Sequence, residues 1–156
     1  MTIEYLDAQD GEVRDIIARS DAYYEDMYPP ESNHLEDEQA LKQGNVLFVG
    51  YRSDDRLVAC GAAKLMQDDG DYAEIKRVFV DQPYRGRGLS IKIMDFIEGE
   101  LMRRGVKLLR LETGVKQPEA IGLYDKLGYQ RRGPYGAYGP DPYSVFMEKR
   151  LGVKHE

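Results

Sequence analysis

The chain has 156 residues, a length that fits one domain with a sizeable core. Hydrophobic residues make up 42% and charged residues 32% of it, and no run of about 18 apolar residues could cross a bilayer. A net charge of −6 argues against a nucleic-acid track, because phosphate contacts need a continuous basic face. We therefore expect a single domain over residues 1–156 that binds neither nucleic acid nor membrane.

The few cysteine and histidine residues exclude several kinds of site. Cys60 is the only cysteine and lies in an apolar stretch, which predicts a buried packing residue and excludes a disulfide or multi-cysteine zinc site. His34 and His155 are far apart in sequence, so a histidine-based triad or metal cluster is not expected, and we predict no metal. The first seven residues lack the pattern of a secretory signal, which predicts a cytoplasmic location.

Two helices and a strand are predicted at the start of the chain. A short strand is expected around Ile3 to Leu6, and Asp10 is the predicted N-cap of a helix. That helix must end before Pro29-Pro30, because proline cannot continue it. Residues 33–41 begin with the Asn-x-x-Glu spacing of a capping box, which predicts a second short helix.

Three strands follow, over residues 46–51, 57–65 and 72–80, separated by turn-forming residues. In the third strand, Glu74, Lys76 and Val78 alternate with Ile75, Arg77 and Phe79, so the two faces are expected to differ in kind. The three strands are expected to form two antiparallel hairpins.

The second half alternates helices and strands. Apolar residues recur four apart from Leu89 to Leu101, which predicts an amphipathic helix that ends at Gly105. A strand over 108–113 and a helix over 118–127 come next, and strands over 129–132 and 144–149 close the chain. The whole pattern is typical of an α/β (α+β) domain with a mixed, mainly antiparallel sheet.

The segment Arg85-Gly86-Arg87-Gly88-Leu89-Ser90 joins a strand to the first turn of a helix. Backbone N–H groups are unpaired there and the helix dipole favours an anion, so the segment suits a phosphate group. The two glycines let a ligand approach the backbone and the two arginines add positive charge. The P-loop pattern is absent and the third glycine of a dinucleotide-binding fold is missing, so neither class fits.

Three segments together resemble the GNAT superfamily of acyl-CoA-dependent N-acetyltransferases. The loop is similar to the family's acyl-CoA loop, residues 73–80 to its fourth strand, and residues 117–129 to its Asn-x-x-Ala-x-x-Leu-Tyr segment, with Gln117 in place of the asparagine. The similarity covers roughly Val46 to Arg150. It implies a GNAT-like sheet of seven strands flanked by about four helices.

The resemblance also implies how acetyl-CoA, the donor substrate, is held. The edge of the strand at Val78, Phe79 and Val80 would pair with the amide groups of pantetheine, and a backbone N–H there would face the thioester oxygen. The loop from Arg85 to Ser90 would hold the diphosphate. Gln117 and Tyr124 would contact the pantetheine arm and the sulfur.

Two side chains are candidates for proton transfer. Glu74 stands where relatives carry a general base, and a base is useful because less than about a thousandth of an alkyl amine is neutral at pH 7. A carboxylate paired with a neighbouring cation is an equal interpretation, and Glu112 and the carboxylates of the acidic first half are rivals. Tyr124 stands where the family's tyrosine reaches the sulfur, which implies an acid for the leaving thiolate. A packing residue with its hydroxyl bonded to the cofactor is the alternative.

The function implied is transfer of an acetyl group to a primary amine of a small molecule, peptide or protein by direct attack. A non-catalytic domain that senses acyl-CoA is the alternative, and it would need the loop but not Glu74 or Tyr124. An RNA-associated protein is a further alternative that the negative charge disfavours; it would use Arg103, Arg104, Lys107, Arg131 and Arg132.

Tyrosine outnumbers phenylalanine by twelve to four. Aromatic side chains suit an apolar or cationic amine acceptor, and they suit equally a contact between two copies of the chain, a homodimer. Six tyrosines fall in the two segments that would surround the acceptor: Tyr23, Tyr24, Tyr28, Tyr135, Tyr138 and Tyr143.

Overall fold

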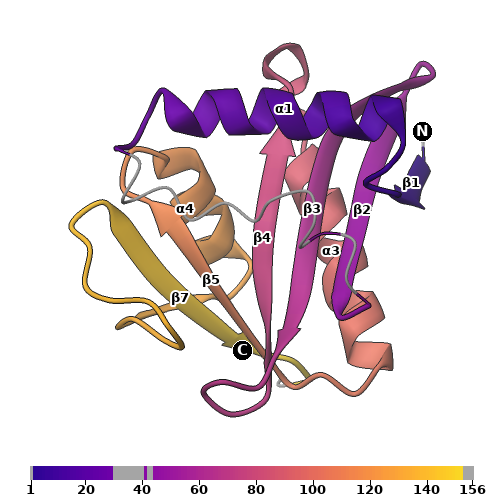
Figure 1. Ribbon diagram of the computed structural model, residues 1–156. Helices are drawn as coiled ribbons and strands as arrows, with labels where there is room; N and C mark the ends of the chain where they lie inside the picture. Colours follow the sequence, from indigo (N-terminus) through magenta and orange to yellow (C-terminus); the bar gives the residue numbers. More distant parts are fainter. Residues whose placement is uncertain (1, 30–40, 42–43, 153–156) are drawn as a thin grey trace.

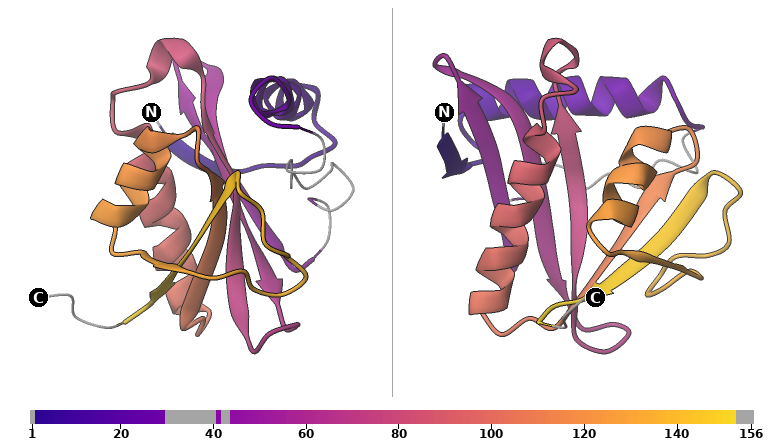
Figure 2. Two further views of the ribbon diagram at one scale, coloured as in Figure 1. Left: turned by 90° about the vertical axis from the view of Figure 1, so that its left-hand side faces the viewer. Right: turned by 180° about the vertical axis from the view of Figure 1, so that it is seen from behind.

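The computed structural model describes residues 2–29, 41 and 44–152. Helix α1 lies on one face of a central sheet, and helices α3 and α4 lie on the other (Figures 1 and 2). The elements are β1 (Thr2–Tyr5), α1 (Gly11–Glu25), β2 (Val46–Ser53), β3 (Arg56–Met66), β4 (Tyr72–Val80), the 3₁₀ turn η2 (Gln82–Tyr84), α3 (Leu89–Arg103), β5 (Leu108–Gly114), α4 (Pro118–Lys126), β6 (Gln130–Arg132) and β7 (Ser144–Arg150).

The seven strands form one mixed sheet in the order β1-β2-β3-β4-β5-β7-β6. Strands β4 and β5 are parallel, and the other neighbouring pairs are antiparallel. The strand and hairpin predictions are therefore confirmed. Three α-helices are described where about four were expected, since residues 33–40 of the helix predicted over 33–41 lie outside the described residues.

The sequence features that predicted the helices make the expected contacts. The carboxylate of Asp10 caps α1 by accepting hydrogen bonds from the backbone N–H groups of Glu12 and Val13 at 2.9 and 3.4 Å. The apolar stripe of α3 is buried against the sheet, and burying each such side chain contributes about 1.5–3 kcal/mol. Helix α3 approaches β3 so closely that a Cβ on Gly61 would lie 2.7 Å from Ile93. A side chain at that position would push α3 away.

Cys60 is buried as predicted, with 1% of its surface exposed. Its thiol donates to the carbonyl of Arg77 at 3.4 Å. Burial raises the pKa of the thiol to about 12, so it stays protonated at neutral pH. Cys60 is therefore a packing residue.

A β-bulge at Arg77 breaks the alternation predicted for β4. Arg77 has a φ of 55°, a left-handed conformation that is uncommon for a residue other than glycine. Three steps along β4, from Lys76 to Phe79, lie opposite two steps along β3, from Ala62 to Cys60. Phe79 consequently packs in the cluster under α1, and Val78 packs against the cluster under α3 together with Ile75. The prediction that Val78 shares a face with Glu74 is wrong for this reason.

The same region of β4 separates from β5. The two strands pair only from Ala73 to Ile75 with Leu109 to Leu111, and beyond that point they diverge (Figure 1). The edge of β4 from Lys76 to Val80 is thus not covered by β5. A gap opens between two neighbouring parallel strands in the middle of the sheet.

Candidate active site

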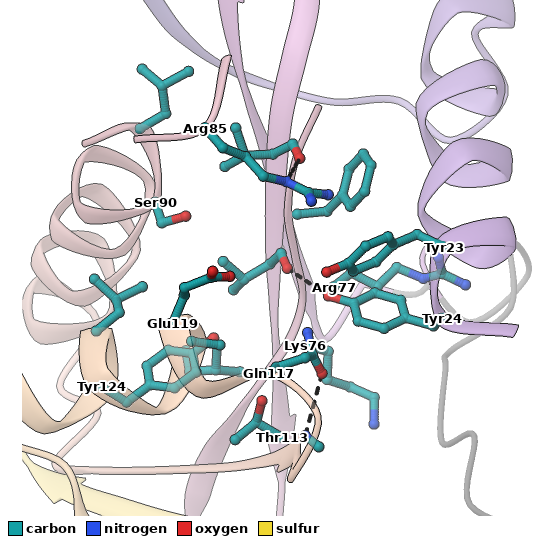
Figure 3. Close-up of a pocket in the computed structure, with 18 of the residues that line it drawn as sticks. Tyr23, Tyr24, Lys76, Arg77, Arg85, Ser90, Thr113, Gln117, Glu119 and Tyr124 are labelled. Carbon is teal, nitrogen blue, oxygen red and sulfur yellow. Dashed lines mark hydrogen bonds between the residues drawn. The ribbon is translucent and has the colours of Figure 1, made fainter. Parts of the chain in front are cut away.

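A cleft of about 630 Å³ fills the gap between the diverging strands. It extends from the loop before α3 to the end of α1, and α4 forms a further wall. Figure 3 shows Tyr23 and Tyr24 reaching in from α1, while Tyr124 and Glu119 face them from α4. Most of the predicted site residues line it: Val78, Phe79, Val80, Arg85, Gly86, Gly88, Leu89, Ser90, Gln117 and Tyr124.

The loop at one end of the cleft has the backbone that its sequence predicts. Gly86 and Gly88 have φ values of 79° and 76°, a left-handed conformation that glycine adopts without a Cβ penalty. Gly88 is the N-cap residue of α3 and offers no side chain to the free N–H groups of the first turn. The loop therefore presents unpaired N–H donors and a helix dipole to the cleft, as a diphosphate group requires.

The two arginines of the loop take different positions. Arg85 points into the cleft, where its Nε donates to the Val80 carbonyl at 3.0 Å and its guanidinium lies 4.5 Å from the ring centre of Tyr23. Arg87 lies against the ring of Tyr84 and is exposed, and it does not line the cleft. The structure thus brings Arg85 to the cleft and leaves Arg87 at the surface.

The free edge of β4 already holds two side-chain contacts. The Val78 carbonyl accepts a hydrogen bond from the Tyr24 hydroxyl at 2.9 Å, and the Val80 carbonyl accepts the bond from Arg85. Both carbonyls therefore face away from β3 and into the cleft. A ligand with amide groups could pair with this edge in the manner of an added strand, in exchange for these contacts.

Glu74, the base candidate predicted from the sequence, is not among the residues that line the cleft. It is 3% exposed, and both carboxylate oxygens are bonded, one to Lys76 Nζ at 3.1 Å and one to the Tyr135 hydroxyl at 2.6 Å. The physical reason is that β4 turns Glu74 to the face of α1, where the loop carrying Tyr135 and Tyr138 covers it. The cation of the pair, Lys76, lines the cleft and also donates to the Tyr138 hydroxyl at 3.2 Å.

Two other carboxylates line the cleft. Glu112 on β5 is half-buried and accepts a hydrogen bond from Ser144 at 2.8 Å, and its charge helps to raise the pKa values of Tyr28 and Tyr124. Glu119 lies in the first turn of α4 and points into the cleft (Figure 3). No sequence pattern indicates a role for Glu119, since an acidic residue is ordinary in the first turn of any helix.

Tyr124 is buried on the α4 wall, with 6% of its surface exposed. Burial raises the pKa of its phenol well above the ordinary value, with smaller contributions from Tyr24 and Glu112. Its hydroxyl forms no hydrogen bond with the part of the chain that the structure describes. Tyr124 is therefore a protonated donor that faces the cleft at neutral pH.

Gln117 joins the two sides of the cleft. It is the N-cap residue of α4 but its side chain does not cap the helix. Its amide oxygen instead accepts hydrogen bonds from the N–H of Gly114 and the hydroxyl of Tyr28, both at 3.3 Å. Tyr24 also lines the cleft, and burial raises the pKa of its phenol. Gln117 thus lines the cleft, but its amide oxygen is engaged with Gly114 and with Tyr28, which follows α1.

Neither a metal cluster nor a membrane-spanning helix is found where the structure describes the chain. Residues 2–29, 41 and 44–152 contain no group of three or more His, Cys, Asp or Glu side chains that could hold a metal ion. Within the same ranges no helix has the length and apolar character needed to cross a bilayer.

The fold and the cleft define a class of protein. A sheet split between two parallel strands, with a glycine loop at a helix start on one side and a buried tyrosine on the other, is the arrangement of an acyl-coenzyme A-dependent transferase. The model of the acetyltransferase (GNAT) family matches residues 13–129. The chain belongs to this family.

Similar proteins agree with this assignment. An IAA acetyltransferase from Azospirillum brasilense is 44% identical over 143 residues, which cover 92% of each chain. A solved structure from Klebsiella pneumoniae, of a protein proposed to be an acyl-CoA N-acyltransferase, is 36% identical with a TM-score of 0.79 and covers 96% of this chain and 97% of the other. The PaiA N-acetyltransferase of Thermoplasma acidophilum, solved with coenzyme A, shares the fold alone, at 17% identity with a TM-score of 0.71 over 97% of this chain and 100% of the other.

The chain is therefore an enzyme that catalyses acetyl transfer, with acetyl-CoA as the donor. A domain that binds acyl-CoA without turnover is not what these relatives indicate.

Proposed function

We propose that residues 1–156 form one N-acetyltransferase domain that moves an acetyl group from acetyl-CoA to a primary amine by direct attack. The observation that carries the proposal is the single cleft that joins the loop at Gly86 and Gly88 to Tyr124 along the free edge of β4. The amine nitrogen forms a bond to the thioester carbon, the carbon–sulfur bond breaks, and the amine loses a proton. Different residues of the cleft bind the donor, take the proton and support the departing sulfur.

The loop and the β4 edge bind the donor. The N–H groups at the start of α3 hold the diphosphate, and Ser90 on the cleft wall adds a hydroxyl donor. The backbone of Val78 to Val80 pairs with the pantetheine amides and presents an N–H to the thioester oxygen. Arg85 places positive charge on the same wall, held there by the Val80 carbonyl and Tyr23.

We assign the base to Glu112, which was a rival to Glu74 in the sequence. Glu112 lines the cleft, whereas Glu74 is enclosed by Lys76 and Tyr135. A carboxylate at Glu112 takes the proton of the incoming ammonium through a water molecule. Glu74 then serves as a positioning residue that fixes Lys76 beside the acceptor.

Tyr124 donates a hydrogen bond to the departing sulfur. Its raised pKa keeps the phenol protonated at neutral pH, so the donor is always in place. The same raised pKa makes the phenol a weaker acid than a thiol with a pKa near about 8.5, so the proton that neutralises the thiolate comes from the acylated amine and not from the phenol. The main effect of Tyr124 is to stabilise the charge that develops on sulfur.

A screen of acceptors tests the proposal directly. The purified chain is mixed with acetyl-CoA and one of a set of amino acids, polyamines, small aromatic amines or peptides, and the released thiol is measured. IAA is tested beside these amines, because the Azospirillum brasilense relative is named for it. We expect at least one primary amine to accelerate thiol release well above hydrolysis. Uniform rates across the set would contradict transfer to an amine.

The two carboxylates can be separated by their pH profiles. Glu112→Gln is expected to lower kcat/KM near pH 7 by about a hundredfold and to remove the acidic limb of the profile, because the base is lost. Glu74→Gln should lower stability and weaken acceptor binding but keep the acidic limb. The reverse pattern, in which only Glu74→Gln removes that limb, would return the role of base to Glu74.

A further inference from the structure

Two tyrosines at the end of α1 connect to opposite sides of the gap between β4 and β5. Tyr24 donates its hydroxyl to the Val78 carbonyl on β4 at 2.9 Å. Tyr28 lies one helical turn further along the chain, and its hydroxyl contacts the segment that follows β5. The N–H of Tyr28 donates to the carbonyl of Tyr24 at 3.2 Å, so the chain continues for one more helical turn after α1. Residues four apart on such a turn lie on the same side, and the two rings therefore point toward the cleft together.

Gln117 lines the cleft together with these two tyrosines. Its amide oxygen accepts a hydrogen bond from the Tyr28 hydroxyl at 3.3 Å. The Tyr28 oxygen in turn accepts from the backbone N–H of Lys116 at 3.2 Å. One hydrogen bond therefore joins Tyr24 to the Val78 carbonyl on β4, and two others join Gln117, Tyr28 and Lys116 on the β5 side. We call the side chains of Tyr24, Gln117 and Tyr28 the bar.

The bar is held firmly on the β5 side. The ring of Tyr28 is 8% exposed and packs so closely on Gly114 that a Cβ there would lie 1.7 Å from the Tyr28 hydroxyl oxygen. Lys116 Nζ donates to the carbonyl of Met27 at 2.7 Å and lies over the ring of Tyr28. A buried polar network whose groups are paired resists rearrangement, because each displaced group would lose its partner.

The bar lies close to the place where the acyl group of the donor is proposed to bind. Tyr124 and α4 lie on one side of the sheet and α1 on the other, and Figure 3 shows Gln117 and Tyr24 between Tyr124 and α1. An acyl group held between Tyr124 and the β4 edge therefore points its chain at the bar. The amine has to arrive beside the bar, where Lys76 and Tyr138 line the cleft.

We propose that Tyr24, Gln117 and Tyr28 set the length of the acyl group that this enzyme transfers, by closing the gap between β4 and β5 behind an acetyl methyl. This assignment rests on the proposed function, because it takes the thioester to lie between Val78 and Tyr124. A longer chain has to displace Gln117 or Tyr28 and break the hydrogen bond between them. The bar is thus a specificity determinant and takes no part in proton transfer.

The test compares acetyl-CoA with butyryl-CoA for the natural chain, Tyr28→Ala and Gln117→Ala. An apolar pocket discriminates by about 10–200-fold per methylene, so we expect the natural chain to favour acetyl-CoA by about a hundredfold or more in kcat/KM. Each variant should raise the butyryl-to-acetyl ratio by about tenfold or more. Calorimetric titration without an acceptor should show the same change in the ratio of the two dissociation constants.

A matched control and a second variant keep the test decisive. Tyr143 packs edge-on against Tyr28 at 6.3 Å between ring centres but is not part of the bar, so Tyr143→Phe should leave the butyryl-to-acetyl ratio unchanged. Should Tyr28→Ala fail to fold, Gln117→Ala decides, because it removes the middle of the bar and leaves the Tyr28 ring on Gly114.

The outcomes separate the two proposals. A folded variant that keeps the natural ratios in both rate and binding would overturn the role of the bar. A natural chain that transfers acetyl groups to an amine while showing no preference for acetyl-CoA over butyryl-CoA would also overturn it. Failure of the natural chain to transfer acetyl groups to any amine would instead contradict the proposed function.

Discussion

Replacing Tyr124 by phenylalanine is expected to lower kcat by about 10²–10⁴-fold, while the KM for acetyl-CoA changes little. The ring of Tyr124 packs in the core next to Tyr129, and phenylalanine preserves that packing. What is lost is a hydroxyl that faces the cleft and supports the leaving sulfur. Steady-state kinetics over a range of acetyl-CoA concentrations measure both constants.

The pH profile adds a second readout for Tyr124. Because its pKa is raised, the phenol stays protonated up to at least about pH 10, and its ionisation cannot cause a fall in rate below that pH. Tyr129→Phe is the control, since Tyr129 is also a buried tyrosine but donates its hydroxyl to Glu98 at 2.8 Å, outside the cleft. It should lower stability and leave kcat unchanged. Equal rates for Tyr124→Phe and the natural chain would remove Tyr124 from the chemistry.

Replacing Gly88 by alanine is expected to weaken coenzyme A binding by at least about tenfold. Gly88 has a φ of 76° at the start of α3, where alanine costs about 1–2 kcal/mol. An alanine that relaxes to a negative φ turns the N–H groups of the first turn away from the cleft. One that keeps the conformation places a methyl group beside the diphosphate. Calorimetric titration with coenzyme A measures the loss.

Gly70→Ala is a closely matched control for that substitution. Gly70 has a φ of 74° in the turn between β3 and β4, and a Cβ there would meet no atom within 4 Å, as at Gly88. The two variants should lose similar free energy of unfolding, but only Gly88→Ala should lose affinity for coenzyme A. Equal affinities in both variants would contradict the role of the loop.

Most of the framework could be predicted because it depends on local patterns. The apolar period of four in α3, the Asp10 cap and the glycines of the loop each specify a short segment, and each is found as predicted. The family could be predicted for the same reason, because its motifs are contiguous. Such signals require no knowledge of distant contacts.

The details of the cleft could not be predicted, because they depend on contacts between distant segments. The left-handed conformation of Arg77 has no sequence signal, since arginine rarely adopts it, and the bulge changes which residues share a face of β4. Glu74 is enclosed by Tyr135, which is 61 positions away in the chain. The bar joins Tyr28 to Gln117 across 89 positions. The sequence predicts only that Tyr24 and Tyr28 belong to a segment that would surround the acceptor, and it does not indicate their hydrogen-bond partners.

The turn before α3 is expected to bind the diphosphate of coenzyme A. Calorimetric titration of the natural chain with free coenzyme A and with pantetheine tests this role most directly. We predict binding heat with coenzyme A at micromolar concentrations, and affinity at least about a hundredfold lower for pantetheine, which lacks the diphosphate. Equal affinity for the two compounds, or no heat with coenzyme A, would contradict it.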